Sequence, residues 1–253
     1  NSYRYRMLAF KEWSKLYKEG KLNQKQRQFF EFKSPEVLYN IDRDPHEIYD
    51  LSSGPEYQKI LIKMREQLRE KLADLPDLSF YPEPYLLDFA INNPVAFGQK
   101  NQQEIMELIA VADLNLFSFN KVQGKIKQAL TSKNPWKRYW GLIVCTSFGK
   151  KAKKFIPLIK DLLNQDHENL VRARAMEYLM LNQEYFDIRI IKEILKKSKS
   201  ETEANLILNS LALVKSLNSQ IKLDLSKQIF PPEWYDKPND LVNRRWDYLI
   251  SDP

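Results

Sequence analysis

The residues best suited to chemistry are one cysteine and two histidines, because thiols and imidazoles serve as nucleophiles, general bases and metal ligands. Cys145 follows Ile143 and Val144 in an apolar helical pattern, which indicates a buried structural thiol rather than a nucleophile. His46 falls in a predicted turn and His167 in a predicted loop between helices. Neither has further residues at metal-ligand spacing. The sequence therefore predicts no catalytic residue and no metal site.

Basic residues form the second group of candidates. The chain has 40 Lys and Arg against 33 Asp and Glu, a formal net charge of +7 and a pI near 9.2. This balance allows nucleic acid, an anionic glycan or an anionic membrane surface as a partner, or simply a lysine-rich surface. The residues that could share one polyanion-binding face, or stand at ordinary solvated turns, are Arg138, Lys150, Lys151, Lys153, Lys154, Arg172 and Arg174.

Composition favours a folded, helical protein. Hydrophobic residues make up 43% of the 253 residues, and there are 6 glycines, fewer than all-β folds and phosphate-binding loops usually contain. A single cysteine permits no disulfide within the chain, and no apolar run approaches the roughly 18 residues of a membrane span. The first residues do not resemble a signal peptide, and the start at Asn1 suggests part of a longer protein.

The N-terminal segment is predicted to combine helices with one strand. Apolar spacing predicts a helix over residues 6–18, and a capping-box pattern at Asn23 and Gln26 predicts a short second helix. Val37–Ile41 predicts a strand, bounded by proline on one side and by aspartates and proline on the other. A lone strand needs partners for its backbone groups, so this segment implies neighbouring strands outside the sequence or a hairpin that the pattern does not reveal.

A longer helix is predicted after Ser53, because Ser-Gly-Pro-Glu supplies an N-cap, a first-turn proline and a glutamate at N3. Its apolar stripe, predicted to pack on a core, consists of Tyr57, Ile60, Leu61, Met64, Leu68 and Leu72. The following segment, residues 75–94, is predicted to be an extended connector at a domain boundary. Its prolines are Pro76, Pro82, Pro84 and Pro94.

The second half of the chain is predicted to repeat a pair of helices. Arg138 and Arg172 occupy similar motifs 34 positions apart, and Leu163 and Leu195 are 32 positions apart. A period in the low thirties with two helices per unit is typical of an α-solenoid, in which each unit buries its apolar face against the next. The C-terminal tail, residues 223–253, is predicted to pack back onto the last repeat or onto the N-terminal part.

An ordered series of motifs over roughly residues 5–80 resembles the C-terminal subdomain of sulfatases close to heparan N-sulfatase (sulfamidase), within the alkaline-phosphatase-like superfamily. The motifs are Gly20–Asn23, Phe29–Phe30, Pro35–Ile41, Asp44–Leu51 and Pro55–Gln58, with Asp50 where the family usually has Asn. In that family this pattern forms a strand, a turn and a packed C-terminal helix. The resemblance implies a small α/β subdomain remnant in a mainly α chain.

A second resemblance covers residues 100–220, which look like the HEAT-like repeats that some bacterial sulfatases carry after the catalytic part. It rests on Asn134–Trp140 and Gly149–Ala152, which resemble a HEAT B-helix and the turn that follows it. The predicted domains are therefore a partial sulfatase C-terminal subdomain at 1–95, with its connector from about residue 75, HEAT-like repeats at 96–222, and the tail at 223–253.

The sulfatase resemblance implies hydrolysis of sulfuric esters or sulfamates on sulfated glycans, in the periplasm or outside the cell. Sulfatases use a formylglycine made within a Cys/Ser-x-Pro-x-Arg motif, together with a calcium ion. The segment Cys145–Gly149 lacks the Pro and the Arg. We therefore expect both groups in a catalytic domain that is absent from this chain, and we predict that the chain alone is inactive.

The resemblance also suggests residues that could contact a sulfated substrate, namely His46, Arg4 and Arg6. The turn containing His46 could instead serve to order the connection between the predicted strand and helix. The implied partners are the protein's own N-terminal catalytic domain and a sulfated glycan. Two other functions remain open, a non-catalytic HEAT-repeat interaction or scaffold module and a basic helical-repeat nucleic-acid binder.

Overall fold

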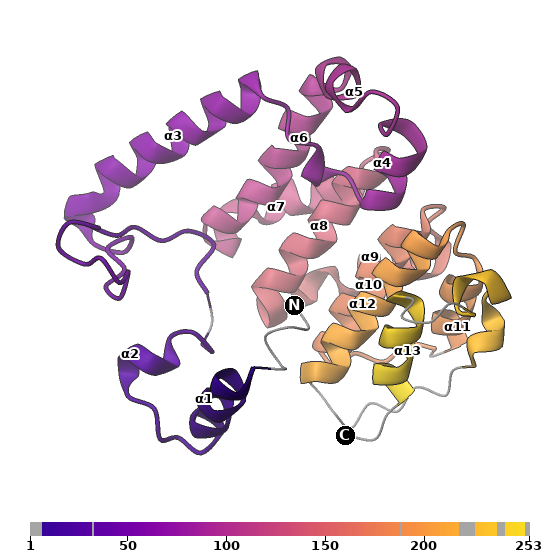
Figure 1. Ribbon diagram of the computed structural model, residues 1–253. Helices are drawn as coiled ribbons and strands as arrows, with labels where there is room; N and C mark the ends of the chain where they lie inside the picture. Colours follow the sequence, from indigo (N-terminus) through magenta and orange to yellow (C-terminus); the bar gives the residue numbers. More distant parts are fainter. Residues whose placement is uncertain (1–6, 32, 188, 218–225, 237–240, 251–253) are drawn as a thin grey trace. The chain divides into compact units, whose positions relative to one another are not determined.

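The computed structural model describes residues 7–31, 33–187, 189–217, 226–236 and 241–250 (Figure 1). Helices supply the regular secondary structure of these residues, and no strand occurs among them, so the prediction of a mainly α protein is confirmed. The chain divides into two compact units, Asn1–Arg69 and Glu70–Pro253. The boundary falls inside a helix, before the segment from residue 75 that was predicted to be the connector.

Unit 1 begins with two helices, α1 (Leu8–Lys18) and α2 (Gln24–Arg27). Asn23 and Gln26 form the predicted capping box at the start of α2, each side chain accepting the backbone N–H of the other residue. Aromatic rings from α1 pack against those that follow α2. The Trp13 ring lies 4.7 Å from the Phe29 ring, centroid to centroid. This aromatic contact holds the two helices together.

The strand predicted over Val37–Ile41 does not form. The N–H of Leu38 donates to Oδ1 of Asp50 at 3.0 Å, and the carbonyl of Leu38 accepts the N–H of Leu51 at 2.8 Å. The Asp50 side chain therefore accepts the hydrogen bond that a neighbouring strand would accept in a sheet. The backbone groups of Leu38 are thus satisfied inside a loop. The prediction was wrong because β-type composition does not specify a strand without a neighbouring strand.

The helix predicted after Ser53 starts later than expected. A 3₁₀ turn, η2 (Pro55–Tyr57), precedes α3 (Gln58–Asp74), and Gly54 rather than Ser53 is the N-cap. The predicted apolar stripe is split within unit 1. Leu61 is 7% exposed, whereas three other residues of the stripe are at least half exposed: Ile60 at 50%, Met64 at 53% and Leu68 at 59%.

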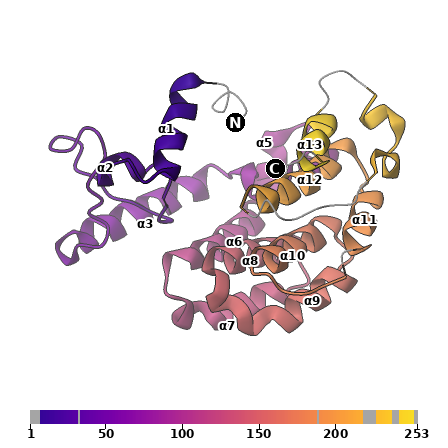
Figure 2. The same cartoon turned by 90° about the horizontal axis from the view of Figure 1, so that it is seen from below.

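Unit 2 is an array of helices in two rows (Figures 1 and 2). In the first row α6 contacts α8, α8 contacts α10, α10 contacts α12, and α12 contacts α13. The second row consists of α7, α9 and α11, of which α7 contacts α8 and the other two contact α10. The bounds are α6 (Gln102–Ala112), α7 (Phe119–Leu130), α8 (Pro135–Phe148), α9 (Ile156–Gln165), α10 (Asn169–Leu181), α11 (Arg189–Lys196), α12 (Glu201–Leu217) and α13 (Leu241–Ile250). Short 3₁₀ turns join them: η4 (Asp113–Leu116), η5 (Gly149–Phe155), η6 (Lys227–Ile229) and η7 (Pro232–Trp234).

The proline-rich segment is folded as part of unit 2 rather than extended. It contains η3 (Leu78–Phe80), α4 (Glu83–Phe89) and the start of α5 (Pro94–Lys100). Pro84 and Pro94 lie in the first turns of their helices, where the missing N–H costs no hydrogen bond. Trp140 donates its Nε1–H to the carbonyl of Phe80 at 2.8 Å, which ties the segment to α8.

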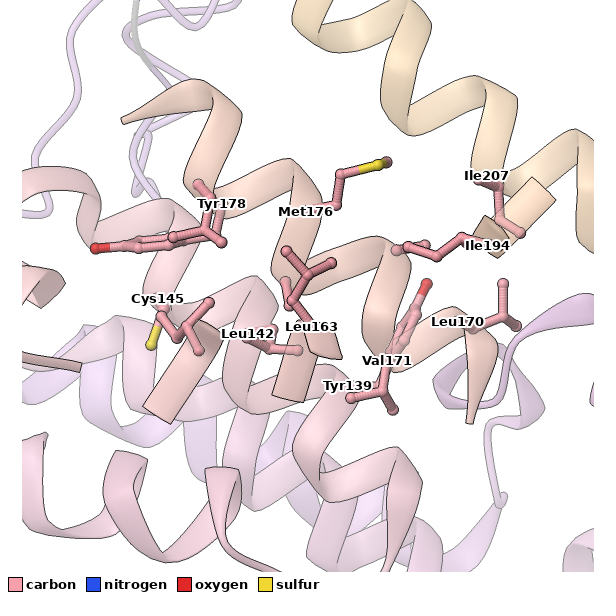
Figure 3. Close-up of a cluster of buried hydrophobic side chains, with 14 of the residues drawn as sticks. Tyr139, Leu142, Cys145, Leu163, Leu170, Val171, Met176, Tyr178, Ile194 and Ile207 are labelled. Carbon is pink, nitrogen blue, oxygen red and sulfur yellow. The ribbon is translucent and has the colours of Figure 1, made fainter. Parts of the chain in front are cut away.

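The core of unit 2 is centred on α10, which is buried between α8, α9 and α12 (Figure 3). Facing side chains come from successive helices, including Tyr139 and Leu142 of α8 and Leu163 of α9. Gly141 allows α7 and α8 to approach closely, because a Cβ there would lie 3.2 Å from the Cβ of Ala129.

The C-terminal tail places α13 along α12. Trp246 and Leu249 of α13 are each 2% exposed. Lys215 of α12 donates from Nζ to the carbonyls of Tyr248 and Leu249, at 2.8 and 2.9 Å. A cation at the C-terminal end of a helix is stabilised by the helix dipole. Across the described residues, no helix combines the length and apolar character that crossing a membrane requires.

Candidate functional site

Cys145 lies on α8 inside the core of unit 2, as the apolar pattern around it predicts (Figure 3). Its side chain is fully buried, and burial raises the pKa of the thiol to about 12. The thiolate is the reactive form of cysteine, so this residue is a poor nucleophile at neutral pH. Among the described residues, no group of three or more His, Cys, Asp and Glu side chains is arranged to hold a metal ion.

His46 is exposed in a turn of unit 1. The turn is held by Asp44, whose Oδ2 accepts the N–H groups of Ile48 at 2.8 Å and Tyr49 at 2.7 Å. An aspartate that accepts nearby backbone N–H groups stabilises a turn without any ligand. The other two residues predicted to contact substrate lie outside the described residues: Arg4 and Arg6.

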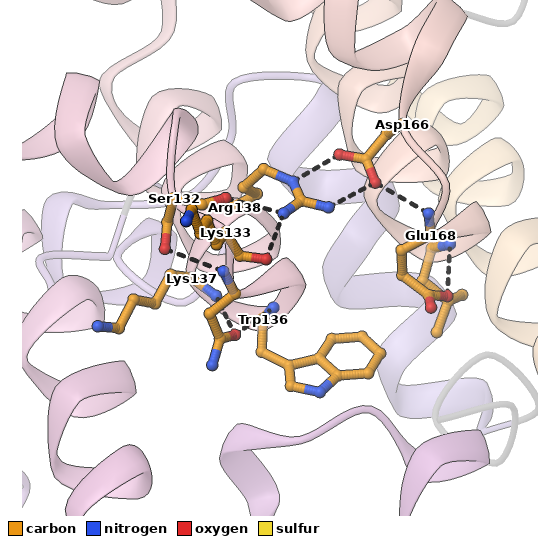
Figure 4. Close-up of polar contacts among 9 residues, drawn as sticks. Ser132, Lys133, Trp136, Lys137, Arg138, Asp166 and Glu168 are labelled. Atoms are coloured by element: carbon orange, nitrogen blue, oxygen red, sulfur yellow. Dashed lines mark hydrogen bonds and ion pairs between the residues drawn. The ribbon is translucent and has the colours of Figure 1, made fainter.

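Arg138, predicted as part of a polyanion face, lies between two turns of unit 2 (Figure 4). Its guanidinium donates to both oxygens of Asp166, Nε to Oδ2 at 2.6 Å and Nη2 to Oδ1 at 2.7 Å. Nη1 donates to the carbonyls of Ser132 and Lys133. The Asp166 side chain is 2% exposed and that of Arg138 14%, so this bidentate pair joins the α7–α8 turn to the α9–α10 turn.

The two other candidate arginines also form internal contacts. Arg172 donates from Nε to the carbonyl of Leu163 at 2.8 Å and pairs with Glu193 at 3.1 Å. Arg174 pairs with Glu177 at 2.7 Å and donates to the hydroxyl of Tyr139 at 2.8 Å. The arginine side chains are 5% and 25% exposed, respectively. These arginines therefore contribute little accessible positive charge.

The four candidate lysines lie together on η5 and point into solvent; they are Lys150, Lys151, Lys153 and Lys154. We call them the lysine turn. Lys153 has an ion pair with Glu184 at 3.5 Å, and Lys154 hydrogen-bonds to Gln123 of α7. Exposed ammonium groups grouped on one turn raise the local potential and attract polyanions.

The sequence patterns did not reveal the α7 residues beside the lysine turn. Gln123 contacts Lys154, and Lys127 follows Gln123 by four positions, so it lies one helical turn along the same face. Lys127 is exposed. No sequence pattern marks Lys127, because its position beside the lysine turn depends on the packing of α7 against η5.

A pocket of about 390 Å³ in unit 2 was not predicted. It lies at the starts of α8, α10 and α12, opposite α4, and its walls combine aromatic rings with carboxylates. Figure 4 shows Trp136 and Glu168 at the starts of α8 and α10, respectively. These residues are scattered over more than a hundred positions, so no local motif marks them.

One known protein gives a partial match to this chain. Over 87 residues the chain is 37% identical to an ulvan-active sulfatase of Formosa agariphila. The match covers 34% of this chain and 15% of that sulfatase, so it spans a small part of the relative's length. No family model and no solved structure matches the chain. The chain therefore contains a region related in sequence to a sulfatase.

Proposed function

We propose that this chain is an accessory part of a sulfatase-type hydrolase that acts on sulfated glycans. In this proposal unit 1 belongs to the sulfatase C-terminal subdomain and unit 2 is a HEAT-like repeat domain that holds the substrate near a catalytic domain elsewhere in the enzyme. The observation that carries the proposal is the 37% identity over 87 residues to a sulfatase.

The catalytic groups of such an enzyme are proposed to lie outside this chain. Cys145 has neither the neighbouring residues of a formylglycine motif nor the exposure that a nucleophile needs. The calcium ion is likewise proposed to be bound by residues of the catalytic domain. We expect no hydrolysis of 4-methylumbelliferyl sulfate by the purified chain, and turnover that Cys145→Ala abolishes would contradict the proposal.

Exposed apolar residues on α3 support a packing role for unit 1. Ile60, Met64 and Leu68 follow one another at helical spacing, and each is at least half exposed. Exposed apolar side chains that share one face of a helix are typical of an interaction site. In the proposal this stripe packs against the catalytic domain.

Recurring contacts in unit 2 support the HEAT-like assignment. The residues that cap α8, α10 and α12 are Asn134, Glu168 and Ser200, which lie 34 and 32 positions apart. Arg138 and Arg172, each four residues after a cap, both donate to backbone carbonyls of the preceding segment and to an acidic residue further along the chain. Similar contacts at similar spacing are expected of stacked repeats.

The lysine turn is the proposed contact for sulfate groups, because its ammonium groups are exposed and its one ion pair among the described residues joins Lys153 to Glu184. The test compares binding of dextran sulfate and of unsulfated dextran to the chain. We expect Lys150→Gln with Lys151→Gln to weaken binding of dextran sulfate by roughly tenfold at low salt and to reduce its salt dependence.

A matched control removes the same charge from unit 1, by Lys59→Gln with Lys63→Gln on the exposed surface of α3. Equal losses in the two double variants would contradict a specific role for the lysine turn. Tighter binding of single-stranded DNA than of dextran sulfate, lost in the lysine-turn variant, would favour nucleic-acid binding instead.

A further inference from the structure

The pocket of unit 2 lies where the starts of three helices meet α4. Its charged residues are Asp88 of α4, Glu104 of α6, Glu168 at the start of α10, and Lys199 and Glu203 at the start of α12. Four of these are carboxylates and one is a lysine. The pocket is therefore acidic in a chain whose net charge is +7.

One wall of the pocket is aromatic. The Tyr85 ring lies 4.6 Å from the Phe89 ring and 4.9 Å from the Trp136 ring, centroid to centroid. Trp136 is 4% exposed, whereas Phe89 is 63% exposed at the rim. Aromatic faces attract organic cations as well as apolar groups.

The carboxylates of the other wall are only partly satisfied. Glu203 is 3% exposed, and its Oε2 accepts the N–H of Lys199 at 2.8 Å. Its Oε1 is buried and finds no hydrogen-bond donor among the described residues. A buried carboxylate oxygen without a donor is costly, so this atom marks a place where a ligand donor would be stabilised.

Glu168 is a second carboxylate that a ligand donor would stabilise. Its side chain is 21% exposed, and Nζ of Lys199 approaches it no closer than 4.0 Å. Burial raises the pKa of Glu168, and the nearby charges of Glu203 and Asp166 raise it further. Lys199 and the N–H of Leu170 act in the opposite direction without cancelling this effect. The carboxylates of the pocket outnumber its single lysine, and that lysine does not offset the effects of burial and of neighbouring carboxylates on Glu168.

We propose that this pocket binds an organic cation, an alkylammonium or guanidinium group on an apolar stem. The cationic head would donate to Oε1 of Glu203 and to Glu168, and the stem would lie against Tyr85 and Phe89. Glu168 accepts the N–H of Leu170 in α10, and Glu203 accepts the N–H of Lys199 just before α12, which explains why acidic residues are tolerated there before a ligand arrives. This inference is independent of the proposed sulfatase role.

The test uses isothermal titration calorimetry on the whole chain. The probes are N-acetyl-arginine amide, its neutral isostere N-acetyl-citrulline amide, and agmatine. We expect the arginine amide to bind at least tenfold more tightly than the citrulline amide, because only the former carries a charge. Equal binding of the two amides, or binding of neither cation, would overturn the proposal.

The cation could come from a protein side chain or from a free amine. Tighter binding of the arginine amide than of agmatine assigns the site to a side chain of a polypeptide, and the reverse order assigns it to a small amine. Either order supports the proposal, because both probes are cations of the proposed class: the arginine amide carries a guanidinium, and agmatine carries a guanidinium and an ammonium.

Variants locate the binding. We expect Glu203→Gln to weaken the arginine amide by about tenfold, since Gln keeps the contact to Lys199 and removes the charge. Phe89→Ala should weaken it about threefold. Their matched controls are Asp161→Asn and Tyr185→Ala, both exposed and outside the pocket. Because Phe89 is at the rim, its variant tests the proposal even if Glu203→Gln fails to fold. Control variants that lose as much affinity for the arginine amide as the pocket variants would overturn the proposal.

Discussion

At the scale of single residues, the arginines of this chain act differently from the lysines near them. Arg138 was predicted to face a polyanion, yet each of its three guanidinium nitrogens donates to an acceptor within the protein. A sequence pattern reveals that an arginine is present and how often it recurs. It does not reveal that Asp166, 28 positions later, lies within hydrogen-bond distance. The exposure of the lysines was easier to predict, because lysine is rarely buried.

We predict that Arg138→Ala destabilises unit 2 by roughly 3–5 kcal/mol, because it leaves the buried carboxylate of Asp166 without its partner. Arg138→Lys should cost less, since an ammonium keeps the charge and loses the bidentate geometry. Urea unfolding followed by circular dichroism measures both. Lys150→Gln is the control for loss of a basic residue, and a cost for it equal to that of Arg138→Ala would refute this account.

Two glutamates should respond to pH with opposite signs. Burial raises the pKa of Glu168, so in the folded protein its proton is held more strongly than in the unfolded chain. The contribution of Glu168 to the free energy of unfolding therefore falls as pH rises from the ordinary pKa of glutamate through the raised pKa. Relative to Glu168→Gln, the wild type should gain stability between pH 7 and pH 4.

Glu193 provides the opposite case. Hydrogen bonds from Lys197 and Arg172 lower its pKa, so its stabilising effect is present at neutral pH and disappears as pH falls through the lowered value. Relative to Glu193→Gln, the wild type should lose stability over the same pH range. Urea unfolding midpoints of the wild type and both variants at pH 7 and pH 4 check the two signs, and differences of the same sign for both residues would contradict the assignments.

At the scale of elements, periodicity predicted the helices more reliably than it predicted their partners. Apolar spacing indicated α1, the repeat pattern indicated the paired helices of unit 2, and two side chains indicated the capping box of α2. The strand over Val37–Ile41 was wrong because its hydrogen bonds depend on Asp50 and Leu51, which no propensity encodes. The proline-rich segment was predicted to be extended because a proline in the first turn of a short helix cannot be told from a helix-breaking proline by sequence.

The stripe of α3 gives an element-scale prediction. Met64→Gln with Leu68→Gln should leave the unfolding free energy of the chain unchanged within about 0.5 kcal/mol, because both side chains are exposed. Leu61→Ala should cost roughly 2–5 kcal/mol, because Leu61 is buried. Thermal unfolding distinguishes the two variants. A large loss in the double variant would mean that the stripe is covered within the chain itself rather than left for a partner.

At the scale of the whole molecule, buried apolar residues are divided unequally between the two units. Among the described residues, unit 1 buries Leu38 and Leu61, whereas the continuous hydrophobic core runs from Tyr81 to Leu249 and lies wholly in unit 2. The repeat spacing of 34 and 32 residues already indicated stacked helix pairs in this region. It could not indicate the acidic pocket at their starts, because those residues come together only when α4 packs near α12.

This division predicts that residues 70–253 fold without unit 1. The fragment keeps every residue of the hydrophobic core, and burial of apolar surface is the main contribution to stability. Unit 1 buries too little to be stable alone, since small units remove a smaller share of their surface from water. We therefore expect the fragment to unfold cooperatively at the midpoint shown by the main transition of the whole chain, and unit 1 to be cleaved first by trypsin. The contrary result is a single thermal transition in the whole chain whose midpoint temperature falls by several degrees in the fragment. It would show that the two units stabilise each other, because stability shared between them is lost on separation.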